Sequence, residues 1–202
     1  NLPSNVEAIA YSFCLTLLSS RLRNPNDNLV VCFFQLPLSL RNLSLDPNYG
    51  ILPPAYQRSL LILSTAMLMC AAKIYQIPEL NDLLQSLVEY DVDSYVGISD
   101  DFQVYVKPRA DLREYGSAAD NQVATSLLYE LRDKIYESNK IILDILVQSL
   151  SGITELEADD IVKQLSEAFT PDDAFMFGPQ SILDLNHIQT IEHSKEPLSF
   201  DG

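Results

Sequence analysis

The sequence predicts an all-α protein organised around one buried helix, and two observations support this prediction. The run Leu60–Ala72 is apolar on every helical face apart from Ser64 and Thr65, and a helix that is apolar all round is a buried helix. Further segments on both sides of this run repeat apolar residues at helical spacing. Outside them, Phe102–Val106 shows the alternation of a short strand.

Two prolines in the sequence indicate where this central helix begins and ends. Pro54 can begin a helix without losing a backbone hydrogen bond, and Pro78 pushes Ile77 out of helical geometry. The alternative is a membrane span, but the uninterrupted run has only 13 residues between Arg58 and Lys73, short of the roughly 20 that cross a bilayer. We therefore expect a core helix with other helices packed on both sides.

Taken in order, the apolar spacing predicts three helical hairpins and a final helix. The hairpins span residues of about 4–45, 54–90 and 120–150, and the final helix spans 154–169. Residues 91–117 are rich in Asp, Gly and Pro and are predicted to form a long inserted loop that can hold one extended segment. The helical-repeat segment therefore covers 1–169, and 170–202 is expected to be a partly ordered C-terminal extension.

Capping signals predict where some of these helices begin. Ser4 and Glu7 form a capping box before the first helix, and Thr154 and Glu157 form another before the last. In the third hairpin, Ser138-Asn139 is predicted to cap a second helix.

Successive two-helix units of roughly 40 residues, each with an apolar face too large to bury alone, are typical of HEAT or armadillo-type solenoids. The helix pairs show no obvious internal sequence repeat, and an ordinary helical bundle would produce the same pattern. We predict stacked armadillo/HEAT-like hairpins, with the bundle as the alternative.

The formal charge of −15 and the pI near 4.3 disfavour binding to phosphate backbones and to anionic lipid headgroups. We expect no nucleic-acid partner and no direct membrane contact by this segment. The chain begins Asn-Leu-Pro with no secretion signal, so we expect a piece of a longer protein.

The three cysteines, Cys14, Cys32 and Cys70, are widely spaced among apolar neighbours. An odd number of this kind is typical of reduced core thiols in a cytosolic protein, and the spacing matches no zinc site. We therefore expect no disulfide.

The sequence contains no recognisable catalytic constellation. His187 and His193 lie in the weakly patterned end without a cysteine or carboxylate pair at ligand spacing. We predict no enzyme, no cofactor and no metal site. The alternative is a concealed carboxylate- or metal-dependent hydrolytic activity that uses Asp100, Asp101 or the histidines, which would require a buried carboxylate beside a pocket.

Two groups of residues are candidates for partner binding. An apolar cluster follows the last predicted helix, and it is either a docking motif or a chain end that folds back over the last helices, which we favour. A basic patch lies in the inserted loop, where a solvated loop is the simpler interpretation. The candidate residues are Phe175, Met176 and Phe177 in the cluster, and Lys107, Arg109 and Arg113 in the patch.

Four longer strings carry a family resemblance across nearly the whole chain. They are LVVCFFQLPLSLRNLSLDP (29–47), QRSLLILSTAMLM (57–69), DFQVYVKPRADLREYGS (101–117) and TPDDAFMFGPQSILDL (170–185). They closely resemble the plant branch of the Efr (eighty-five-requiring) family, the semi-rolled-leaf type, which is related to rolling blackout of animals.

The resemblance implies a non-catalytic, all-helical rod that anchors a phosphatidylinositol 4-kinase complex, type III alpha, at the plasma membrane. Its partners would be tetratricopeptide-type and hyccin-type subunits. Because that family makes its membrane contacts near the N-terminus of a much longer chain, this piece resembles a C-terminal-half segment. Alone it is expected to be soluble and cytosolic, and within the longer chain it would lie at the cytoplasmic face of the plasma membrane.

In animal relatives the C-terminal region holds the tetratricopeptide partner, which places Phe175 and Phe177 as candidates by position only. A different cytosolic HEAT-type adaptor, or a homodimer formed through the Phe175 region, is the alternative within the scaffold class.

Overall fold

The structure is a computed structural model that describes residues 2–46, 52–88, 90–108 and 113–170. The chain divides into two units, Asn1–Ala168 and Phe169–Gly202, and all the elements below belong to the first. In chain order they are α1 (Leu2–Leu22), α2 (Asp27–Leu45), α3 (Pro54–Ile74), α4 (Pro78–Val88), β1 (Val96–Ile98), β2 (Val104–Val106), α5 (Ala118–Ile153) and α6 (Ala158–Ser166).

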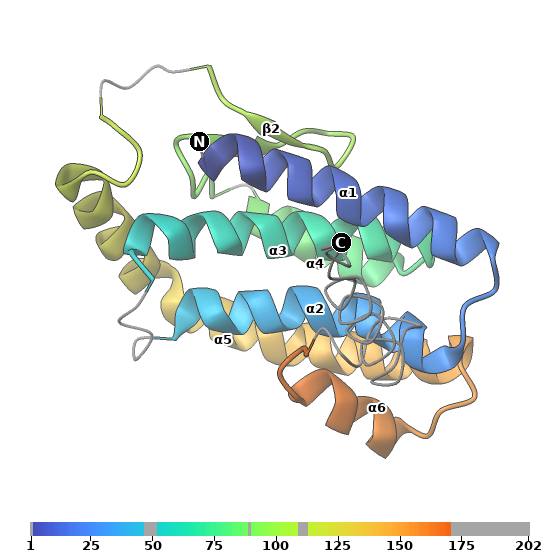
Figure 1. Ribbon diagram of the computed structural model, residues 1–202. Coiled ribbons are helices and arrows are strands. Elements are labelled where there is room, and N and C mark those ends of the chain that lie inside the picture. The colour runs from blue at the N-terminus through green and yellow to red at the C-terminus, as the bar shows by residue number, and fades with distance from the viewer. Residues whose placement is uncertain (1, 47–51, 89, 109–112, 171–202) are drawn as a thin grey trace, which may run out of the picture. The chain divides into compact units, whose positions relative to one another are not determined.

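The central helix is α3, which α1, α2, α4 and α5 all contact (Figure 1). It begins at Pro54, and 15 of its 21 residues are buried. The two polar residues of the apolar run, Ser64 and Thr65, satisfy their hydroxyls by donating to the carbonyl of Leu61. α3 is long and apolar enough to cross a membrane, but 78% of its most apolar 18-residue stretch is buried inside the protein. The predicted core helix is confirmed.

The first capping box is wrong, because α1 begins at Leu2 and therefore already contains Ser4. Glu7 makes a tertiary contact instead of a cap. Its carboxylate accepts a hydrogen bond of 3.0 Å from the backbone N–H of Val106, which fastens β2 to α1.

The predicted break in the third hairpin is also wrong, because α5 runs unbroken through Ser138 and Asn139. The Ser138 hydroxyl donates to the carbonyl of Lys134, one turn back, so it does not compete for a helix end. The Asn139 side chain accepts a hydrogen bond from Arg41 of α2. The Ser138 hydroxyl and Oδ1 of Asn139 thus have partners inside one long helix, while Nδ2 of Asn139 is buried with no partner among the described residues. Residues 120–150 form no hairpin.

The last helix is shorter than predicted, and its capping box is wrong. Thr154 ends α5, where its N–H and its hydroxyl both donate to the carbonyl of Leu150. Glu157 is the N-cap of α6 but makes no side-chain capping bond. α6 packs against α2 and α5, with Ile161 and Leu165 buried.

The inserted segment 91–117 holds two strands where one extended segment was expected. β1 and β2 pair antiparallel in the register Val96↔Val106, Gly97↔Tyr105 and Ile98↔Val104. The sequence did not predict β1 because this strand contains Gly97, and glycine is depleted in strands. A Cβ at Gly97 would lie 2.8 Å from the Tyr105 ring, so the missing side chain is what lets that ring cross the strand.

The cysteine expectation is wrong for two of the three residues. Cys14 of α1 and Cys70 of α3 form a disulfide, with Cα atoms 6.2 Å apart and a sequence separation of 56. The packing of α1 on α3 brings them together, which spacing alone does not reveal. Cys32 is buried on α2, where its Sγ accepts a hydrogen bond from Gln164.

Candidate functional site

A buried ion cluster is centred on Arg58, near the start of α3. Its Nη1 and Nη2 lie 2.9 and 3.1 Å from the two carboxylate oxygens of Asp120 on α5, which is the bidentate geometry of a strong arginine–carboxylate pair. Its Nε lies 3.3 Å from Oδ2 of Asp93 in the inserted segment. All three side chains are 1% exposed or less, so the cluster joins three parts of the chain inside the core.

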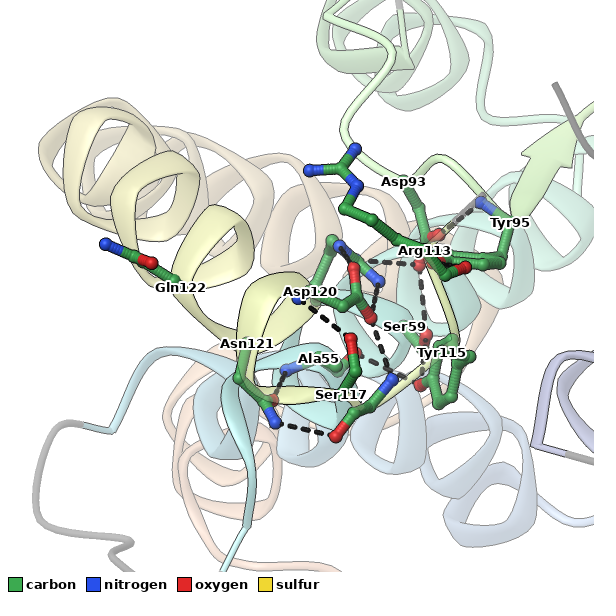
Figure 2. Close-up of polar contacts among 12 residues, drawn as sticks. Ala55, Ser59, Asp93, Tyr95, Arg113, Tyr115, Ser117, Asp120, Asn121 and Gln122 are labelled. Atoms are coloured by element: carbon green, nitrogen blue, oxygen red, sulfur yellow. Dashed lines mark hydrogen bonds and ion pairs between the residues drawn. The ribbon is translucent and has the colours of Figure 1, made fainter. Parts of the chain in front are cut away.

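Each carboxylate has further donors that hold it in place (Figure 2). Asp93 accepts from the backbone N–H of Tyr95 at 2.8 Å and from the hydroxyl of Ser59 at 2.9 Å. Asp120 accepts from the N–H of Gly116 at 2.9 Å and lies in the first turn of α5, where the helix dipole favours a negative charge. Hydrogen bonds from neighbouring groups thus fix the position of both carboxylates independently of Arg58.

Two tyrosine rings close the cluster. The guanidinium of Arg58 lies 5.4 Å from the centroid of Tyr95 and 5.9 Å from that of Tyr115, within cation–π range. The Tyr115 hydroxyl lies 2.8 Å from Oγ of Ser59 and 3.1 Å from the carbonyl oxygen of Ala55. Burial raises the pKa of Tyr115, so this phenol stays neutral and serves as a hydrogen-bonding group.

The electrostatics favour a charged Arg58. Burial by itself lowers the pKa of this guanidinium, but the hydrogen bond that it donates to Asp120 and the charges of Asp93 and Asp120 outweigh the effect of burial, so the pKa lies above its usual value. A closed cluster of this kind has no exposed nucleophile or base. Its chemistry is structural, because it ties the inserted segment and the start of α5 to the central helix.

A second buried arginine, Arg41 of α2, has a different environment. Its Nε donates to Oδ1 of Asn139 at 2.6 Å, and its Nη1 donates to Oγ1 of Thr65 at 2.8 Å. Both partners are neutral, and burial lowers the pKa of Arg41 to about 10. This residue borders a small cavity of about 20 Å³, which Lys134 also lines.

The predicted basic patch is partly taken up by contacts within the inserted segment. The ammonium of Lys107 binds the carboxylate of Asp91 and donates to the carbonyl of Asp93. The backbone carbonyl of Arg113 accepts a hydrogen bond from the hydroxyl of Tyr95 at 2.8 Å. Arg109 lies outside the described residues.

The apolar cluster of Phe175, Met176 and Phe177 also lies outside the described residues. Partner binding by these three residues, and by the basic patch, stays a prediction.

No catalytic arrangement occurs in the part of the chain that the structure describes. Within it, no group of three or more His, Cys, Asp or Glu side chains is placed to hold a metal ion. Asp100 and Asp101 are exposed in the turn between β1 and β2, and His187 and His193 lie outside the described ranges. The buried carboxylates are instead Asp93 and Asp120, which sequence reasoning missed because their partner Arg58 is distant in the chain.

Helices packed around a buried α3, with buried acids that pair with an arginine, define an all-α protein whose described ion cluster is structural. The chain belongs to the EFR3 family, because the family model described as EFR3, armadillo repeat, matches residues 1–182. The predicted all-α, armadillo-like fold is thereby confirmed over the ordinary bundle.

A curated relative supports the same assignment. The chain is 41% identical over 201 residues to Protein SEMI-ROLLED LEAF 2 of Oryza sativa subsp. japonica, and the match covers 100% of this chain and 20% of the relative. The chain thus spans about a fifth of that protein's length. No solved structure matches the chain.

Proposed function

We propose that this chain is a non-catalytic scaffold segment of a plasma-membrane adaptor that recruits a phosphatidylinositol 4-kinase complex through protein–protein contacts. Membership of the EFR3 family is the observation that supports this proposal. The buried ionisable groups agree with it, because Arg58, Asp93 and Asp120 are engaged with one another inside the fold and none faces a substrate pocket. The expected partners are the tetratricopeptide-type and hyccin-type subunits.

The outer face of α1 supports a role within a longer rod. Tyr11, Leu15, Leu18 and Leu22 are all exposed and recur at the spacing of one helical face, separate from the face that α1 buries in the core. A repeat stacked between neighbours needs two such apolar faces. We assign this face to an adjacent helical repeat of a longer protein, since the chain spans about a fifth of the length of its rice relative.

A paired substitution tests that assignment. Leu15→Lys/Leu18→Lys should lower the melting temperature of the full-length protein by several degrees, because it places two charges in a packed interface. The same change in the 202-residue chain should leave the melting temperature nearly unchanged, since both side chains face solvent there. Equal effects in the two proteins would contradict the assignment.

The partner prediction is tested by a binding titration between the purified segment and the tetratricopeptide-type subunit. A Phe175→Ala/Phe177→Ala variant should bind at least tenfold more weakly if these rings are interface anchors. Tyr129→Ala is the matched control, because Tyr129 is 80% exposed on α5 and its loss removes an aromatic ring elsewhere. Circular dichroism verifies that all three proteins stay folded.

The outcomes separate the possible sites. Unchanged binding by the double variant would move the search to Lys107, Arg109 and Arg113. If the segment recovered neither kinase-complex subunit while the full-length protein recovered both, the scaffold role would belong to another part of the protein.

A further inference from the structure

Arg41 is a buried cation for which the described part of the chain supplies no carboxylate. Its side chain is 1% exposed, and two of its five N–H groups donate to the neutral side chains of Asn139 and Thr65. Among the described residues, ion pairs within 4 Å join Arg58 and Lys107 to aspartates but do not include Arg41. Burial alone lowers the pKa of Arg41, with no carboxylate acting against it.

The guanidinium borders a small, partly open pocket. A cavity of about 20 Å³ lies against Arg41 and Thr65, and because Thr65 also accepts from Nη1 of Arg41, the charged end of the side chain reaches the cavity wall. A volume above roughly 10–15 Å³ holds one water-sized species. The site therefore has room for a single small occupant and excludes larger molecules.

The described residues that line the cavity include two cations and no acid. Lys134 of α5 is the second cation, and its ammonium binds the hydroxyl of Tyr90, which lines the same cavity. The rest of the lining is apolar apart from Thr65. Two cations on one pocket favour an anion as its occupant, even in a chain of net charge −15. The described lining residues are Arg41, Leu61, Ile62, Thr65, Leu87, Val88, Tyr90, Val92, Leu131, Lys134 and Ile135.

A bound water would not compensate the positive charge of Arg41. It would accept a hydrogen bond from Arg41 but would bring no negative charge, and an unpaired buried charge is strongly unfavourable. With a pKa of about 10, Arg41 stays protonated at neutral pH. We propose that this cavity is a binding site for one small inorganic anion the size of chloride, held by Arg41 with Lys134 as the second positive charge.

Thermal unfolding of the 202-residue chain tests the proposal. At constant ionic strength, replacing sodium gluconate by sodium chloride or bromide should raise the melting temperature by a few degrees and then saturate, because an anion that binds only the folded state stabilises it by mass action. Gluconate is too large for the cavity and serves as the reference. The probe for location is bromide, whose anomalous signal in a crystal should appear beside Arg41.

Three variants make the test specific. Arg41→Met should abolish the halide-dependent rise, and Lys134→Gln should weaken the apparent bromide affinity roughly fivefold, as expected for loss of one nearby charge. Lys140→Gln is the matched control: Lys140 is exposed on the same helix but does not line the cavity, so affinity should be unchanged. If Arg41→Met fails to fold, the comparison of the two lysine variants still decides.

Two results would overturn the proposal. The first is an equal melting temperature in gluconate and in saturating halide, with no bromide peak beside Arg41, which would show that the cavity holds water only. The second is a halide-dependent rise that persists in Arg41→Met or that falls equally in the two lysine variants, which would place the halide effect elsewhere on the protein.

Discussion

Arg58 and Arg41 are both fully buried, both lie on helices of the same core, and both reach α5, yet their surroundings have opposite charge balance. Arg58 meets two carboxylates, Asp93 and Asp120, so its cluster carries one excess negative charge. Arg41 meets an amide and a hydroxyl, so its site carries an excess positive charge. The pKa values follow this difference, with Arg58 raised and Arg41 lowered.

The difference shows that burial alone does not determine what an arginine does. At Arg58 the protein supplies the counter-charge, and the arginine acts as a strut that ties the inserted segment and α5 to α3. At Arg41 the described residues supply only neutral acceptors and a cavity, so the counter-charge has to arrive from solution.

The largest expected effect comes from breaking the Arg58 cluster. Asp120→Ala should lower the free energy of unfolding by about 3–5 kcal/mol, because removing one partner of a buried ion pair leaves an incompletely compensated charge. Urea unfolding measures this loss. Asp133→Ala, at an exposed position of the same helix, should change stability by less than about 0.5 kcal/mol. Similar losses in the two variants would show that the Arg58 cluster is not a strut.

A smaller effect is expected from Thr65→Val, which keeps the shape of the side chain but removes the acceptor of Arg41 Nη1. The loss should be about 1–2 kcal/mol, since a buried charged donor is left without its partner. Thr125→Val removes a hydroxyl that donates to a helix carbonyl at an exposed site of α5 and should cost much less by the same urea assay. A loss as large as that of Asp120→Ala would contradict the view that Arg41 depends on neutral partners.

Tyr115→Phe tests how strongly the inserted segment is attached to α3. It removes the hydroxyl near Ser59 and the Ala55 carbonyl but keeps the ring over Arg58. We expect a loss of about 1 kcal/mol and faster hydrogen exchange in β1 and β2, because the inserted segment loses one of its attachments to α3. Tyr129→Phe at a solvent-exposed position should change neither property.

The smallest effect is a pH dependence at Arg41. Because burial lowers its pKa to about 10, the unfolded chain holds the proton to a higher pH than the folded protein does, and stability rises with pH where the unfolded state binds more protons. In gluconate buffer, the stability of the wild type relative to Arg41→Met should therefore increase by somewhat less than about 1 kcal/mol from pH 9 to pH 10.5. If the stability difference between the wild type and Arg41→Met stays constant over this pH range, the pKa of Arg41 is not lowered, and a negative charge within the protein compensates the guanidinium.

Sequence reasoning predicted the parts of this molecule that depend on local patterns. The all-round apolar run and the flanking prolines identified α3, because burial and helix ends leave local signals. Arg58 was read only as the end of that run, since its partners lie 35 and 62 residues later in the chain and no local rule pairs them.

The wrong capping predictions have one physical cause in common. Glu7, Asn139 and Thr154 are residue types that favour helix ends, and the sequence assigned all three to caps. In the structure Glu7 binds β2, Asn139 binds Arg41, and Thr154 closes the end of α5 rather than preceding α6. A local pattern assigns these polar groups to the start of a helix. In the structure they bind residues distant in sequence or cap the end of a helix instead.

The most direct test of the comparison is the pair Arg58→Met and Arg41→Met, measured by urea unfolding in chloride and in gluconate. We expect Arg58→Met to lose about 3–5 kcal/mol of stability in both salts, because it leaves two buried carboxylates without their partner. We expect Arg41→Met to lose less than about 1.5 kcal/mol in chloride and nothing in gluconate, since an apolar side chain replaces an uncompensated charge. Equal losses for the two substitutions, with no difference between the salts, would contradict this expectation.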